Sequence, residues 1–161
     1  MTGIGKINVF ALLMLLAGLV QAGSPGVRVW TTQQNLETTY DSVYKSLEEK
    51  HFFVVFEPNI GQNLARFSER WGEDYNRNAL SGIRSMVFCN AWYANQVSNL
   101  DPDMLALCPL HVTLYGRNNE TRIVFTRPGY VGEGSKAQAL LLELEDAVAG
   151  AIEQAIAPAT P

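Results

Sequence analysis

The apolar and polar positions along this chain predict strands and helices in alternation. Five stretches have strand character, either strict alternation or a short run of aromatic and β-branched residues: 27–32, 52–56, 83–88, 107–115 and 121–126. The last two flank the turn at residues 116–119, which predicts a β-hairpin near the end of the chain. A sheet that contains such a hairpin is expected to be largely antiparallel.

Helical spacing of apolar residues separates most of these strands. The sequence predicts helices with apolar faces running from Leu36 to Leu47 and from Ile60 to Trp71, and a shorter helix over residues 89–98. Thr38 is the predicted N-cap of the first. The final helix carries Leu140, Leu141, Leu144, Val148 and Ile152 on one face, and Ser135 with Gln138 predicts a capping box at its start. The β-α-β-α-β-β-β-α order predicts an α+β fold, with a largely antiparallel sheet of about five strands covered by helices.

The N-terminal segment has the three-part pattern of a secretory signal peptide. Lys6 precedes an apolar run from Ile7 to Val20, and Val20-Gln21-Ala22 is a small-x-small cleavage pattern. We expect cleavage after Ala22, a flexible start at residues 23–26, one domain over residues 27–155 and a flexible tail at residues 156–161. An uncleaved membrane anchor is the alternative, but the apolar run is shorter than the roughly 20 residues of a typical span.

The composition of the chain excludes some classes of binding partner. The 161-residue chain has a net charge of −4 at pH 7, and cleavage after Ala22 would remove the cation Lys6 as well. No basic cluster occurs, so nucleic acid and anionic membranes are poor partners on electrostatic grounds. The sequence therefore predicts an exported protein without a membrane span after cleavage, periplasmic if its source is a Gram-negative bacterium. A strand edge or sheet face could support a homodimer.

Cys89 and Cys108 are the chain's only two cysteines. An even count in an exported protein makes a disulfide between them the leading interpretation. The alternatives are two buried apolar thiols or a redox-active pair, although no C-x-x-C motif is present.

Cys108 and His111 form a C-x-x-H pair, which suggests a metal or haem ligand set. Strand geometry argues against it, because Cys108 shares a face with Leu110 and Val112 while His111 points to the other side. We therefore predict no metal and no cofactor. Near Cys89, the aromatic residues Phe88, Trp92 and Tyr93 are either core residues or the wall of an apolar pocket.

Around these cysteines the sequence resembles the family called domain of unknown function 302. The resemblance is carried by the segments 88–94, Asp101-Pro102 and 107–115, and it covers roughly residues 27–155. Two departures from the family pattern occur: Ala91 stands where proline is usual, and Cys108 precedes Pro109 where the usual order is Pro-Cys. The resemblance implies a compact α+β domain whose curved antiparallel sheet is backed by helices, and it assigns no activity.

The leading functional hypothesis is an accessory domain of the cell envelope that binds a small ligand or an envelope protein. The sequence contains no complete catalytic motif, which favours a binding role over an enzyme. The predicted binding residues are Cys89, Asn90, Trp92, Tyr93, Cys108 and His111. The second hypothesis is a thiol-redox or electron-transfer accessory enzyme that uses Cys89 and Cys108. The third is a metal or haem carrier that uses Cys108 and His111.

Overall fold

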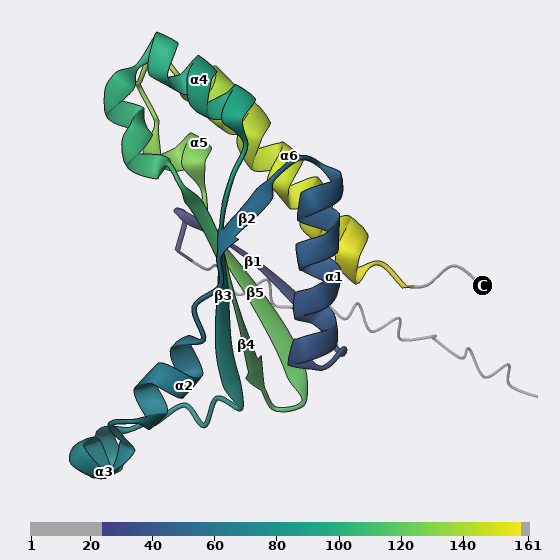
Figure 1. Ribbon diagram of the computed structural model, residues 1–161, viewed down its shortest axis with the longest axis vertical. Helices are drawn as coiled ribbons and strands as arrows, with labels where there is room; N and C mark the ends of the chain where they lie inside the picture. Colours follow the sequence, from purple (N-terminus) through teal and green to yellow (C-terminus); the bar gives the residue numbers. More distant parts are fainter. Residues whose placement is uncertain (1–23, 159–161) are drawn as a thin grey trace, which may run out of the picture.

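The computed structural model describes residues 24–158, so the predicted signal peptide at residues 1–22 lies outside the described residues. One five-stranded sheet forms the centre of the fold, and every neighbouring pair of strands is antiparallel. Its spatial order is β1-β5-β4-β3-β2 (Figure 1). The strands are β1 (Val27–Thr32), β2 (Phe53–Phe56), β3 (Gly82–Cys89), β4 (Leu110–Arg117) and β5 (Glu120–Thr126). The predicted α+β class and antiparallel sheet are confirmed.

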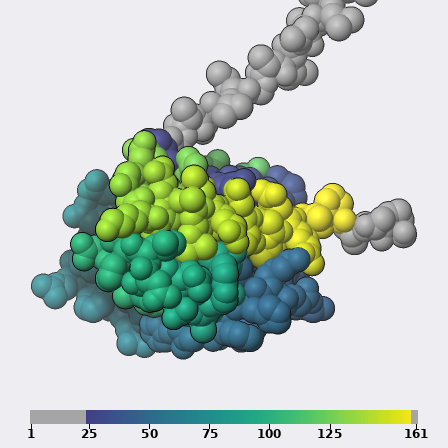
Figure 2. All heavy atoms as spheres, turned by 90° about the horizontal axis from the view of Figure 1, so that it is seen from above, coloured from purple at the N-terminus to yellow at the C-terminus, as the bar shows by residue number. Residues whose placement is uncertain are grey.

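Helices cover mainly one side of this sheet. Figure 1 shows α1, α4 and α6 on one side, whereas α2 and α3 project from the lower end of the molecule. Figure 2 shows α4 packed beside α6 over the top of the body. The helices are α1 (Leu36–Glu49), α2 (Ile60–Ala65), α3 (Ser68–Trp71), α4 (Ala91–Leu100), α5 (Pro128–Val131) and α6 (Gln138–Ile156), with 3₁₀ turns η1 (Gly72–Asp74) and η2 (Pro102–Leu107). No helix within residues 24–158 is long and apolar enough to cross a membrane.

The core lies between the sheet and α1 and α6. Along β4 the burial alternates, with Leu110, Val112 and Leu114 buried and His111 exposed. Because successive strand residues point to opposite faces, one face of the sheet supplies the core and the other does not. From the helices, the same core receives Tyr40, Val43, Leu47, Leu141, Leu144, Val148 and Ile152.

The register of the last two strands is set by a two-residue hairpin. Arg117 pairs with Glu120, and the intervening Asn118 and Asn119 both have positive φ, 52° and 61°. Asparagine tolerates this left-handed conformation better than most residues, and two consecutive positive φ values match the right-handed twist of the flanking strands. The turn therefore places Val112 opposite Phe125, so that both side chains enter the core.

Both predicted helix caps are wrong in detail. Asn35, not Thr38, caps α1, and its side chain accepts a hydrogen bond from the Thr38 N–H at 2.9 Å. Starting the helix earlier lets Thr39 and Tyr40 turn into the core. The predicted capping box at α6 does not form, because the Ser135 hydroxyl donates to the carbonyl of Gly132 and the Gln138 side chain accepts from Gly134 N–H. These bonds close the turn before the helix.

The helix predicted between Ile60 and Trp71 is broken into α2 and α3, and we call these two helices together with η1 the arm (Ile60–Asp74). Phe67 interrupts it, with a backbone conformation of φ −110° and ψ 7°. None of the three helical pieces contains a buried residue. The arm is therefore amphipathic in sequence, but its apolar side chains do not enter the core.

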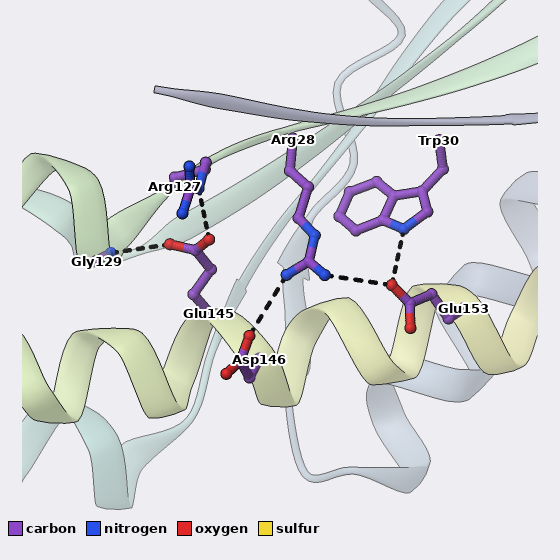
Figure 3. A network of polar contacts seen from close by, with 7 residues as sticks. All are labelled: Arg28, Trp30, Arg127, Gly129, Glu145, Asp146 and Glu153. Atoms are coloured by element: carbon purple, nitrogen blue, oxygen red, sulfur yellow. Dashed lines mark hydrogen bonds and ion pairs between the residues drawn. The ribbon is translucent and has the colours of Figure 1, made fainter. Parts of the chain in front are cut away.

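Glu145 of α6 is a buried carboxylate that connects the helix to the chain after β5. Its side chain is 3% exposed and accepts hydrogen bonds from Arg127 Nε at 2.7 Å and from the Gly129 N–H at 3.1 Å (Figure 3). A Cβ at Gly129 would lie too close to Leu142 Cδ2, so a larger residue at this position would require the Leu142 side chain to move. Two turns further along α6, Glu153 accepts from Trp30 Nε1 at 3.2 Å.

Replacing Glu145 by alanine is expected to destabilise the fold strongly. The change removes both hydrogen bonds and leaves the buried Gly129 N–H without an acceptor, so we expect a loss of about 3 kcal/mol in the free energy of unfolding, measured by urea denaturation. The matched control is Glu153→Ala on the same helix. The Glu153 side chain is 54% exposed, and its loss should cost less than about 1 kcal/mol. Equal losses for the two variants would contradict the assigned role of Glu145.

Candidate functional site

The structure brings four of the six predicted binding residues together at the ends of β3 and β4. Cys89 closes β3, Cys108 precedes β4, and both thiols line one small cavity with Asn90 and Tyr93. The Asn90 side chain caps α4 by accepting from the N–H groups of Trp92 at 3.0 Å and Tyr93 at 3.2 Å. Asn90 therefore has a structural task at this position.

The predicted disulfide between Cys89 and Cys108 is not formed. Both cysteines are free thiols and do not lie at disulfide distance. The pairing of β3 with β4 ends at Phe88 and Leu110, so Cys89 and Cys108 are not paired across these strands, whereas a cross-strand disulfide requires directly opposed side chains. Burial raises the pKa of the Cys108 thiol, and the neighbouring Cys89 raises that pKa further.

The cavity between the cysteines is too small for a ligand. Its volume is about 10 Å³, near the minimum for one water molecule. The Tyr93 ring stacks on Phe52 at 6.0 Å between centroids, and its hydroxyl donates to Glu143 at 3.0 Å. Burial is the main cause that raises the pKa of Tyr93, and the hydrogen bond to Glu143 raises that pKa further. These contacts match the packing interpretation of the aromatic cluster.

The other two predicted residues lie outside this cavity. Trp92 is 55% exposed on α4 and meets Tyr93 edge to face at 4.9 Å. His111 is exposed on the face of β4 opposite Leu110 and Val112, as strand alternation predicts. Within residues 24–158, no group of three or more His, Cys, Asp or Glu side chains is arranged to hold a metal ion.

Another cavity lies at the other end of β3, and we call it the Arg84 pocket. Its volume is about 460 Å³, within the range of small-molecule sites. The first turn of α1, the start of β3, α2 and the loop at residues 75–81 enclose it. Its apolar lining comes from Leu36, Leu64, Ala65, Leu80 and Ile83, and its polar lining includes Glu37, Asn59, Gln62, Asn76, Ser81 and Arg84.

Arg84 is held at the wall of this pocket by an aromatic ring and a carboxylate. Its guanidinium lies 3.7 Å from the centroid of the Tyr40 ring and forms an ion pair with Glu37. Burial alone would lower the pKa of the Arg84 guanidinium, but Glu37 and Tyr40 together raise that pKa above its ordinary value. The arginine is therefore a fixed cation whose charge Glu37 already balances.

Behind Arg84, a buried tyrosine connects the pocket to the second strand. The Tyr40 hydroxyl donates to Glu57 Oε2 at 2.7 Å. Burial and the hydrogen bond to Glu57 raise the pKa of Tyr40 well above its ordinary value, so it stays a neutral donor. The cluster of Glu37, Glu57 and Arg84 carries one net negative charge, which favours a neutral or cationic ligand over an anion.

Sequence reasoning missed this pocket because its residues come from separate stretches that form no motif. One signal was available: Arg84 is two residues before Met86 and four before Phe88, so this cation shares their face of the strand, the face that enters the core. Buried charges need partners, and such a position is a candidate for a built polar site.

Comparison with known proteins identifies the fold. The family model described as "Domain of unknown function DUF302" matches residues 28–158. The crystal structure of an uncharacterized conserved DUF302 protein from Bacillus stearothermophilus is similar, with a TM-score of 0.70 at 16% sequence identity. The similarity covers 82% of this chain and 99% of that chain. No curated protein matches this chain.

Cys108 is expected to be a slow nucleophile in the folded protein. Thiolate is the reactive form, and each unit by which the pKa is raised reduces the thiolate fraction at neutral pH roughly tenfold. In a Cys89→Ser variant, iodoacetamide should therefore modify Cys108 more slowly before unfolding than after it. The difference should shrink as the pH rises above 9.0, the ordinary cysteine value, because the native thiol then ionises.

Mass spectrometry of the modified peptide measures both rates. A native Cys108 that reacts as fast as an unfolded one at neutral pH would contradict the raised pKa. In the unaltered protein, thiols that appear only after reduction would instead support the disulfide expected from the sequence.

Proposed function

We propose that this chain, which belongs to the DUF302 family, is an exported binding domain of the cell envelope that holds a small amphipathic molecule in the Arg84 pocket. The observation that carries the proposal is the pocket itself: a concave site of about 460 Å³ with apolar walls and a few convergent polar groups. This combination is typical of small-molecule sites.

The charges of the pocket favour a neutral polar head on the ligand. Arg84 is already paired with Glu37, so an anionic ligand would have to compete with that carboxylate. The Gln62 side chain offers a hydrogen-bond donor and an acceptor, which suits a neutral group, whereas Asn59 caps α2 and Asn76 is bonded to the backbone of Leu80. The apolar body of the ligand would lie against Leu36, Leu64 and the other apolar residues of the wall.

Export is the second component of the proposal, and it is supported by the sequence pattern of residues 1–22 alone. An apolar run that follows Lys6 and ends in Val20-Gln21-Ala22 is the pattern of a cleaved signal peptide. In the envelope, the domain would meet small molecules before they reach the cytoplasm, which agrees with an accessory binding role.

Two dyes that differ in charge test the ligand proposal. N-phenyl-naphthylamine is neutral and apolar, and it should bind with one equivalent per chain and gain fluorescence. Its anionic analogue, anilinonaphthalene sulfonate, should bind at least about tenfold more weakly, a difference of about 1.4 kcal/mol, because the Glu37–Arg84 pair and Glu57 disfavour an anion.

A variant that fills the pocket locates the dye. Ala65→Trp places an indole in the Arg84 pocket and should abolish the binding of N-phenyl-naphthylamine. The matched control is Ala91→Trp at an exposed position of α4, where binding should be unchanged. Equal dye binding by the two variants would show that the dye binds elsewhere and would reject the pocket.

Processing of the full chain in a Gram-negative host tests export. We expect the protein in the periplasmic fraction, with a mass that corresponds to a first residue of Gly23. Leu13→Arg interrupts the apolar run and should leave the full-length chain in the cytoplasm, whereas Thr2→Arg, before that run, should be exported normally. Full-length protein in the membrane fraction would instead indicate an uncleaved anchor.

A further inference from the structure

The arm (Ile60–Asp74) exposes apolar side chains that nothing in the described protomer covers. Its helices have six and four residues, whereas an isolated helix in water needs about 12–15 residues to be even marginally stable. Short helices in proteins are held by packing, yet Leu64, Phe67 and Trp71 are 37%, 45% and 40% exposed. Phe67 and Trp71 stack on each other at 5.1 Å, so they form one apolar projection. Figure 1 shows α2 and α3, the elements that carry these residues or flank them, extending away from the body.

A second uncovered surface is the sheet face opposite α1 and α6, which we call the open face. On β1, Arg28 and Trp30 reach toward α6 (Figure 3), so Val27 and Val29 point the other way and are 38% and 44% exposed. At the opposite edge, β2 exposes Phe53, Val55 and Phe56. Between these edges the face carries half-buried residues of the central strands, together with the exposed His111 and Arg117; the half-buried residues are Val87, Thr113, Tyr115, Arg122 and Val124.

The free edge of β2 is a poor place for a partner strand. The Val54 N–H is already bonded to Glu48 Oε1 at 2.8 Å, and the pairing of β2 with β3 is irregular between Val54 and Phe56. A side chain that caps the edge and a bulge both discourage strand addition. Strand addition at this edge is therefore disfavoured, and a partner at this end of the sheet would pack on the open face.

We propose that a second copy of this chain covers the open face, with the arm of each protomer packed on the open face of the other. A two-fold dimer requires that one chain carry both complementary surfaces, and this chain carries an apolar projection and an apolar face that do not cover each other. The net charges are small and of opposite sign: the arm carries Glu69, Glu73 and Asp74 together with Arg66 and Arg70, and the open face carries Arg117 and Arg122 together with Glu120.

The available area suits a dimer. Five strands about 4.8 Å apart and about six residues long give a projected face of roughly 500 Å², so two copies supply roughly 1,000 Å² before the arms are added. Specific interfaces bury about 1,200–2,000 Å² in total, a range that the two arms would bring within reach. The dimer would also provide the packing that holds the short helices of the arm.

Sedimentation equilibrium tests this assembly. The unaltered protein should be dimeric at about 10 μM. Trp71→Glu on the arm and Val29→Glu on the open face should each raise the dimer dissociation constant at least about 100-fold, or about 2.7 kcal/mol, because each buries a charge in both contacts of the dimer.

Two control variants carry the same tryptophan-to-glutamate and valine-to-glutamate changes at exposed positions outside the arm and the open face. Trp92→Glu and Val131→Glu alter residues that are 55% and 51% exposed on α4 and α5, and both variants should remain dimeric. Circular dichroism spectra and unfolding midpoints identify any variant that is monomeric only because it is misfolded.

Mixing the two monomeric variants tests which surfaces meet. In a mixed dimer, the unaltered arm of the Val29→Glu protomer meets the unaltered open face of the Trp71→Glu protomer, so one of the two contacts is intact. The mixture should therefore form dimers more strongly than either variant alone.

Three results would overturn the proposal. They are a monomeric wild-type protein at about 100 μM, a dimer equally sensitive to Trp92→Glu, and a mixture that associates no better than its components. A monomer that co-sediments with phosphatidylcholine vesicles through Trp71 would assign the arm to a lipid surface in place of a second copy.

Discussion

A carboxylate that is almost completely removed from water must be balanced by charge and hydrogen bonds, and this requirement fixes how α6 lies on the sheet. Glu145 meets it with Arg127 and the Gly129 N–H, both from the segment that follows β5. The side chain cannot move along the sheet without leaving these partners, because an unpaired charge in this position would be strongly destabilising. Glu153, near the end of α6, bonds to Arg28 and Trp30 of β1, so the helix is tied at two positions to the same edge of the sheet.

This attachment has a consequence for the opposite face of the sheet. Because Arg28 and Trp30 must reach α6, strand alternation directs Val27 and Val29 away from it. The same alternation along β4 buries Leu110, Val112 and Leu114 beneath the helices and turns His111 outward. The domain thus has two layers, and the contacts that build its core also determine which side chains remain on the open face.

The layers could be predicted from sequence because they depend on local periodicity. The alternation at residues 27–32 matches β1 residue for residue, and the apolar face from Leu140 to Ile152 lies within α6. Where the prediction was wrong, a competing interaction decided the outcome. Asn35 caps α1 through the hydrogen bond that it accepts from the Thr38 N–H, and the predicted Ile60–Trp71 helix is interrupted where Phe67 takes a non-helical backbone conformation.

The sites were less predictable than the fold, since they depend on contacts between distant residues. Cys89 and Cys108 line one small cavity, but the separation that leaves them free thiols cannot be read from composition or spacing. The Arg84 pocket combines residues from four separate segments, and only the cation within the apolar alternation of β3 hinted at it. Periodicity locates a face; it does not say which faces from other elements will meet it.

The arm and the Arg84 pocket share one element, and this relates the two proposals. Gly61, Gln62 and Leu64 of α2 form part of the pocket wall, and α2 is also the base of the arm. Gly61 packs against the backbone of Ile83, where an added Cβ would lie 2.9 Å from the Ile83 nitrogen, so the base of the arm is fitted closely to β3. A contact that holds the arm would therefore also hold one wall of the pocket.

Binding free energies are reciprocal: if a second copy orders α2 and so favours the ligand, the ligand must favour the second copy by the same factor. In this arrangement, assembly and ligand binding act on the same short helix, α2. Its six residues include no buried residue, so contacts from outside the helix contribute to holding it in place.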